Sequence, residues 1–84
     1  MEINRELRKQ IFEIIENQMR NNDPPETTLT FARLKKEGFN DFEVKQLIGQ
    51  CIACELSAIF KTRQPFNEKR YVKNLNRLPN KPNE

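Results

Sequence analysis

The chain has 84 residues, of which 36% are hydrophobic and 32% are charged, and its formal net charge is +3. This length fits one domain that folds without disulfides or bound metal, but it is too short for a core and a deep substrate cavity together. These values argue against enzymes that enclose a large substrate.

The net charge conceals an asymmetry along the chain. Residues 1–60 hold eight Lys/Arg and ten Asp/Glu, whereas residues 61–84 hold seven Lys/Arg and two Asp/Glu. Attraction to acidic partners should therefore come from the C-terminal third. The chain starts without a basic segment leading into an apolar one, and no apolar run approaches the ~18 residues of a membrane span. We expect a cytoplasmic protein with no transmembrane segment and with reduced cysteines.

Apolar residues spaced by three and four predict a first helix over residues 3–20, with one broad buried face. Asp23 can cap a second helix over residues 24–37, because Pro24 suits the first helical position and Glu26 follows three residues after the cap. Leu29 projects to the side opposite Phe31 and Leu34, so we expect it to be exposed.

The junction after the second helix carries the clearest local signal. Gly38 suits a left-handed backbone at the end of a helix. Asn40 and Glu43 have the spacing of a capping box, and the apolar residues on either side of it, Phe39 and Val44, have that of a hydrophobic staple. A third helix over residues 41–61 follows. It is apolar around most of its circumference, which favours a central position.

Pro65 disfavours helical geometry in the residue before it and so helps to end the third helix. Asn67 can cap a fourth helix over residues 68–78, with Phe66 and Tyr71 as its staple. Residues 79–84 contain two prolines and nothing to bury, so we expect a disordered tail. The predicted fold is all-α, a compact antiparallel bundle of four helices in a single domain, residues 1–78, with the third helix central.

A family of short uncharacterised bacterial helical domains shares a pattern of residues with this chain over about residues 23–79. The matching positions are Asp23-Pro24-Pro25-Glu26, Arg33-Leu34, Gly38-Phe39, Ile48-Gly49, Glu55, Pro65-Phe66-Asn67-Glu68, Tyr71, Leu75 and Leu78-Pro79. The chain resembles this family, and the resemblance implies the helical fold and a single domain but no activity. A His-Glu-x-x-His run that some relatives carry is replaced here by residues 42–46, which lack both histidines, so a metal role does not transfer.

Two features could carry chemistry. Cys51 and Cys54 have the spacing of redox and zinc motifs, but they lie inside an apolar helix and the chain has no other cysteine and no histidine. We interpret them as core residues and expect no metal and no cofactor.

Glu55 lies in the middle of the most apolar stripe of the third helix. A buried carboxylate needs a partner, and Arg33 and Tyr71 on the neighbouring helices are the first candidates. Glu55 could be a general acid or base with a raised pKa. We favour a buried structural pair.

The strongest binding signal is a basic stripe near the C-terminus. Lys69, Lys73 and Arg77 recur at i, i+4 and i+8, Arg70 lies beside them, and Lys61 and Arg63 lie just upstream. Such a stripe can contact nucleic-acid phosphates, an acidic protein or an anionic membrane, or it can be only a solvated face. A helix-turn-helix centred on Gly38 is disfavoured, because the third helix is core material rather than a base-reading helix.

We therefore predict a small non-enzymatic protein-interaction module whose partner is an unidentified protein or a second copy of the chain. The alternative is weak, non-specific nucleic-acid binding through the same cations, and an enzyme that uses Glu55 is a distant third.

Overall fold

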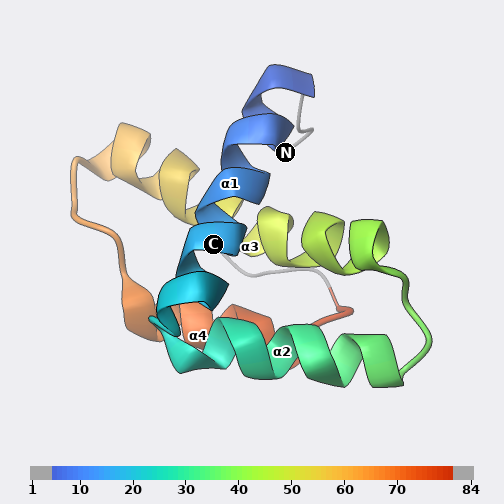
Figure 1. The fold of residues 1–84 in the computed structure, drawn as a ribbon. Coiled ribbons are helices and arrows are strands. Elements are labelled where there is room, and N and C mark those ends of the chain that lie inside the picture. The colour runs from blue at the N-terminus through green and yellow to red at the C-terminus, as the bar shows by residue number, and fades with distance from the viewer. Residues whose placement is uncertain (1–4, 81–84) are drawn as a thin grey trace.

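A computed structural model describes residues 5–80, which form four helices and no strand (Figure 1). The helices are α1 (Arg5–Asn21), α2 (Pro25–Lys36), α3 (Asp41–Thr62) and α4 (Glu68–Arg77). The all-α, four-helix prediction is confirmed, and each described helix end lies within a residue or two of the predicted one. The predicted start of the first helix lies outside the described residues. The same holds for most of the predicted tail, which was expected over residues 79–84.

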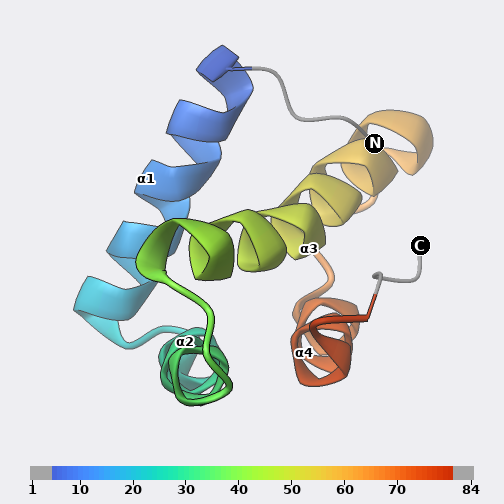
Figure 2. The same ribbon diagram turned by 90° about the vertical axis from the view of Figure 1, so that its right-hand side faces the viewer.

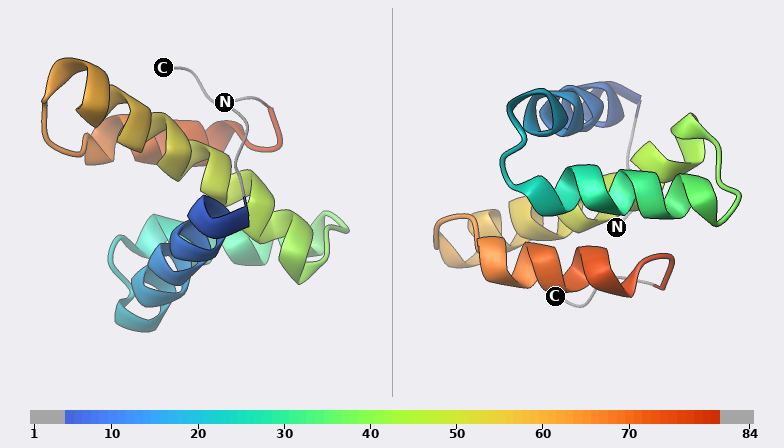
Figure 3. Two further views of the ribbon diagram at one scale, coloured as in Figure 1. Left: turned by 90° about the horizontal axis from the view of Figure 1, so that it is seen from above. Right: turned by 60° about the horizontal axis from the view of Figure 1, so that its bottom comes forward.

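The helices pack in two directions rather than along one common axis. Helices α2 and α4 lie side by side and run the same way, α3 runs opposite to both, and α1 crosses the other three steeply (Figures 1, 2 and 3). Helix α3 is thus antiparallel to α2 and to α4. Helix α1 is not aligned with the other three, as it would be in an up-and-down bundle. Asn22, with a left-handed φ of 52°, turns the chain between α1 and α2.

Helix α3 contacts each of the other helices, as predicted for a central element, but α2 does so as well. Within residues 5–80 the backbones of α1 and α4 do not meet. The core is built mainly on α3 and is completed from the other helices; its fully buried apolar side chains include Val44, Ile48, Cys51 and Ile52 with Ile11, Ile15, Leu34, Tyr71 and Leu75.

The far end of α3 is not core. Phe60 is 87% exposed, because the last turns of α3 project beyond the helices that cover its middle (Figure 2). Apolar residues in the sequence therefore predict burial correctly along most of this helix, but not at its C-terminal end.

The predicted junction between α2 and α3 is confirmed. Gly38 has a φ of +108°, the Asn40 side chain accepts from the Glu43 amide at 2.8 Å, and the Glu43 side chain accepts from the Asn40 amide at 2.9 Å. The start of α2 differs from the prediction: Pro24 is the capping residue, and the Asp23 side chain makes no capping bond. The Asp23 amide instead donates to the carbonyl of Gln18, which keeps residue 23 in the turn that leaves α1.

Candidate functional site

The two sides of α4 differ sharply in character. Tyr71, Asn74 and Leu75 are buried against the core, whereas Lys69, Lys73 and Arg77 are exposed on the opposite side. We call these three residues the outer face of α4. None of the three forms an ion pair with an acidic residue of the described chain, so the outer face offers its charge to solvent or to a partner.

Glu55 holds the N-terminal end of α4 against α3. Its side chain is fully buried and accepts from Arg70 Nε at 2.5 Å, from Arg70 Nη2 at 3.1 Å and from the Asn67 amide at 2.9 Å. The prediction that Glu55 is buried and paired is confirmed. The predicted partners, Arg33 and Tyr71, are wrong, because Arg70 lies on the side of α4 that faces α3 while Arg33 lies at the other end of α4.

Arg33 holds that other end. Its guanidinium donates to the carbonyls of Leu75 at 3.0 Å and Leu78 at 3.1 Å, and it pairs with Glu37 at 2.7 Å. The last carbonyls of a helix lack the i+4 amides that serve the others, and here Arg33 adds its bond to Leu75, whose carbonyl also accepts from the Leu78 amide at 3.2 Å. Helix α4 is therefore fixed at its start by α3 and near its end by α2.

Tyr71 belongs to a separate polar cluster that joins three helices. Its hydroxyl lies 3.0 Å from Thr27 Oγ1 and donates to Gln18 Oε1 at 2.9 Å, and Thr27 Oγ1 also donates to Gln18 Oε1 at 2.8 Å. Burial, the largest cause, raises the pKa of the Tyr71 phenol above its ordinary value of 10.0, so the hydroxyl is a neutral donor. This cluster fixes α4 against α1 and α2 and has no charged member.

The structure separates the six predicted surface cations into three places. Lys69, Lys73 and Arg77 make up the outer face of α4. Lys61 and Arg70 line one small hollow of about 170 Å³ between α3 and α4, together with Cys54, Ser57, Ala58 and Thr62. Arg63 lies at the tip of α3, where its left-handed φ of 57° ends the helix and where it lines a hollow with Ile59 and Phe60.

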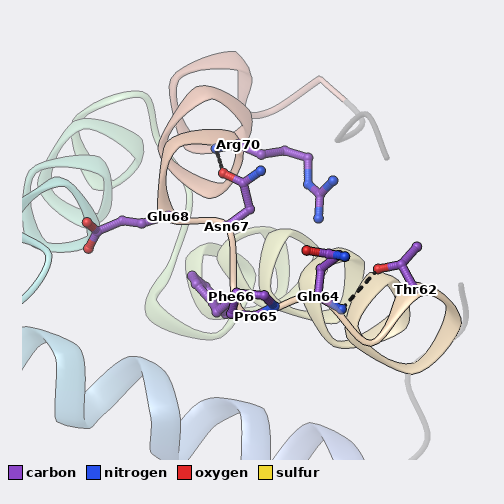
Figure 4. A pocket seen from close by; sticks show the side chains of 7 residues that line it. All are labelled: Thr62, Gln64, Pro65, Phe66, Asn67, Glu68 and Arg70. Atoms are coloured by element: carbon purple, nitrogen blue, oxygen red, sulfur yellow. Dashed lines mark hydrogen bonds between the residues drawn. The ribbon is translucent and has the colours of Figure 1, made fainter.

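An open hollow of about 440 Å³ lies at the linker from α3 to α4 (Figure 4). Its lining includes Thr62, Gln64, Pro65, Phe66, Asn67 and Arg70. Free amides at a helix start are a natural anion site. Here the Asn67 amide donates to Glu55, and the Arg70 amide donates to the Asn67 side chain at 3.0 Å. The remaining lining residue is Glu68, the only carboxylate among the seven.

Of the two cysteines interpreted as core residues, Cys51 lies in the core, whereas Cys54 is half-buried and lines the hollow between α3 and α4. Cys51 is fully buried, and burial, with a smaller contribution from neighbouring Cys54, raises the pKa of its thiol from 9.0 to about 12. A thiol with so high a pKa is a poor nucleophile at neutral pH. Among residues 5–80 no group of three or more His, Cys, Asp or Glu side chains is arranged to hold a metal ion.

A cluster of aromatic rings and cations across α1 and α3 was not predicted. The Phe12 and Phe42 rings meet edge to face with centroids 5.8 Å apart, Arg8 lies 5.3 Å from the Phe42 centroid, and Lys45 lies 5.9 Å from the Phe12 centroid. Lys45 also pairs with Glu16 at 3.0 Å. These residues are about 30 positions apart in the sequence, and no local pattern indicates that they meet. The cluster fixes where α1 crosses α3.

Searches of family models, curated proteins and solved structures found no match to this chain. The resemblance to a family of bacterial helical domains therefore stays a prediction. None of the helices in the described part of the chain has the length and apolar character needed to span a membrane.

Proposed function

We propose that this protein is a small, non-enzymatic interaction module that binds an acidic protein surface through the outer face of α4. One observation supports the proposal above all: Lys69, Lys73 and Arg77 stand exposed and unpaired in one row, on a helix held at its start by Glu55 and near its end by Arg33. A row of cations on a fixed helix presents a charge pattern of constant geometry.

The row is also unfavourable in the free protein. Like charges at i and i+4 on a helix repel by a few tenths of a kcal/mol per pair. Carboxylates on a partner would replace this repulsion with attraction and would speed the encounter. As part of the same proposal we place the protein in the cytoplasm, where both cysteines would stay as the free thiols seen here.

Two observations favour a protein partner over the alternative, a nucleic acid. At the start of α4 the Glu55 carboxylate already accepts from the Asn67 amide and the Asn67 side chain from the Arg70 amide, so two of the amides that could meet a phosphate are taken. The outer face of α4 also lacks an aromatic side chain on which a base could stack. Glu55 is saturated by Arg70 and Asn67, which supports a structural role for this carboxylate rather than a catalytic one.

The test is a charge reversal with a matched control. In one variant Lys69, Lys73 and Arg77 are changed to Glu; in the control the exposed cations of α1, Arg5, Lys9 and Arg20, are changed to Glu, which alters the net charge equally. Affinity capture from lysate should recover specific proteins with the wild type and the control, and should lose them with the α4 variant. Capture of the same proteins by the α4 variant would refute the proposal.

A salt titration of a random DNA duplex separates the alternative. We expect at most weak duplex binding that disappears at physiological salt. Duplex binding that survives at physiological salt and is abolished by the α4 reversal would assign the outer face to nucleic acid instead.

A further inference from the structure

We propose that the binding surface continues from α4 onto the exposed side of α2 and that its occupant is an amphipathic acidic helix of the partner. This inference rests on the proposed function and specifies the partner's chemistry. The two helices lie side by side with their outer sides uncovered by any other described helix (Figures 2 and 3). They therefore form one two-helix platform.

The apolar part of this platform lies on α2. Leu29 is 67% exposed, and Ala32, three residues later and also exposed, adjoins it on the same side of the helix. The small Ala32 side chain leaves an open hollow whose other lining residues are Phe31, Arg33, Lys35 and Lys36. An apolar side chain from a partner can contact Leu29 and enter this hollow.

Arg33 shows which side of α2 faces α4. It lies one turn after Leu29, and its guanidinium reaches the carbonyls of Leu75 and Leu78. Two contacts fix the register of α2 against α4: Thr27 lies 3.0 Å from the Tyr71 hydroxyl, and Arg33 reaches the Leu75 carbonyl. Leu29 lies between Thr27 and Arg33 in α2 and is therefore level with the middle of α4. The apolar pair therefore lies on the helix next to the one that carries Lys69 and Lys73.

The charges at the platform favour an acidic occupant toward its C-terminal end. Lys36, Lys73 and Arg77 are exposed there without an acidic partner in residues 5–80, while Glu37 and Asp41 already pair with Arg33 and Lys35. The platform's remaining acids, Glu26 and Glu68, lie in the first turns of the two helices, at the opposite end.

The spacing favours a helix as the occupant. Cations one helical turn apart, about 6 Å, match carboxylates that recur one turn apart on a second helix. An apolar stripe between such carboxylates would meet Leu29 and the hollow over Ala32. This is the helix-in-groove mode of recognition, with apolar anchors flanked by charge.

The test uses three fluorescein-labelled peptides of equal net charge and the full-length protein. The first is an amphipathic helix with Leu at i, i+3 and i+7 and flanking Glu, the second has the same composition in scrambled order, and the third has Ala in place of Leu. We expect the first to bind about tenfold more tightly than the other two in fluorescence anisotropy, because it alone offers an apolar contact to Leu29.

Leu29→Ser should remove that tenfold preference, and Phe60→Ser, which changes the most exposed apolar side chain outside the platform, should retain it. Both positions are exposed, so both variants should fold, which circular dichroism checks.

Equal binding of all three peptides, unaffected by Leu29→Ser, would overturn the proposal that the occupant is an amphipathic helix. It would leave the proposed role of the outer face of α4 unchanged. Absence of binding of any acidic peptide at about 1 mM would overturn both. Tighter binding of a 16-base-pair duplex than of the first peptide would also overturn both.

Discussion

At the scale of single residues, Glu55 shows how a charge can be buried in a small core. Both of its oxygens accept hydrogen bonds, and the Arg70 side chain that supplies two of them is 34% exposed. Arg70 thus remains partly hydrated while the carboxylate is fully enclosed, which lowers the cost of burying the pair.

Glu55→Ala should lower the free energy of unfolding by about 2–4 kcal/mol, because it leaves Arg70 without its partner and opens space in the core. Urea unfolding followed by circular dichroism measures the loss. Glu16→Ala is the control: it removes the exposed ion pair with Lys45 and should cost less than about 1 kcal/mol. Equal losses in the two variants would mean that the Glu55 pair contributes no more than a surface pair.

The buried thiol of Cys51 predicts a loss of stability in alkali. The folded state holds its proton up to about pH 12, whereas an unfolded chain releases it near pH 9.0. Stability from this group is therefore full below pH 9 and falls as the pH rises toward 12, by about 1.4 kcal/mol at pH 10.

Urea unfolding between pH 8 and pH 10 should show a decline that is shallower in Cys51→Ala than in the wild type. Only the difference in slope matters, because the substitution also lowers stability at every pH by leaving a small cavity. Cys54→Ala, at a half-buried position, is the comparison. The same slope in Cys51→Ala and in the wild type would contradict the proposed protonation of Cys51.

At the scale of the helices, the ends that were predicted well are those set by neighbouring residues. The junction at residues 38–44 needs only a left-handed glycine and a reciprocal pair of side-chain bonds, all within seven positions. The α4 start follows the same logic, since Asn67 caps it and the Phe66 and Tyr71 rings meet with centroids 5.3 Å apart. The start of α2 was displaced by one residue because Asp23 is held by a bond to Gln18 on the preceding helix.

Asn40→Ala should lower stability by about 1 kcal/mol, since it removes the side-chain acceptor that caps α3 and breaks the capping box. Thermal unfolding by circular dichroism measures this change. Asn76→Ala is the matched control at an exposed position inside α4, where alanine has the better helix propensity and the change should be neutral or slightly stabilising. A neutral Asn40→Ala would show that α3 keeps its start through packing alone.

At the scale of the whole molecule, the steep crossing of α1 decides how much apolar surface remains open. The sequence left a second copy of the chain open as the partner, and the broad apolar face of α1 could drive such self-association if part of it stayed uncovered. In the structure Ile11 and Ile15 are fully buried, and Leu7, Phe12, Ile14 and Met19 are packed against the core. The most exposed large apolar side chains are spread over α2, both ends of α3 and the following linker.

We therefore expect sedimentation at micromolar concentration to give a monomer of 10.0 kDa. Scattered apolar residues do not make the continuous patch that a stable dimer needs. A mass of twice this value, lost on changing Leu29 or Phe60 to Ser, would identify a second copy as the occupant of that position.

The amino-acid sequence by itself determined the helices, the caps of α3 and α4, the burial of Glu55 and Cys51, and the exposed row of Lys69, Lys73 and Arg77, because these follow from helical periodicity and from contacts within a few residues. Only the tertiary structure decided which cation pairs with Glu55, where Arg33 and Tyr71 bond, how α1 crosses α3, and that α2 lies beside α4. Those outcomes depend on the angles and directions at which helices pack, and such angles depend on contacts between residues far apart in the chain.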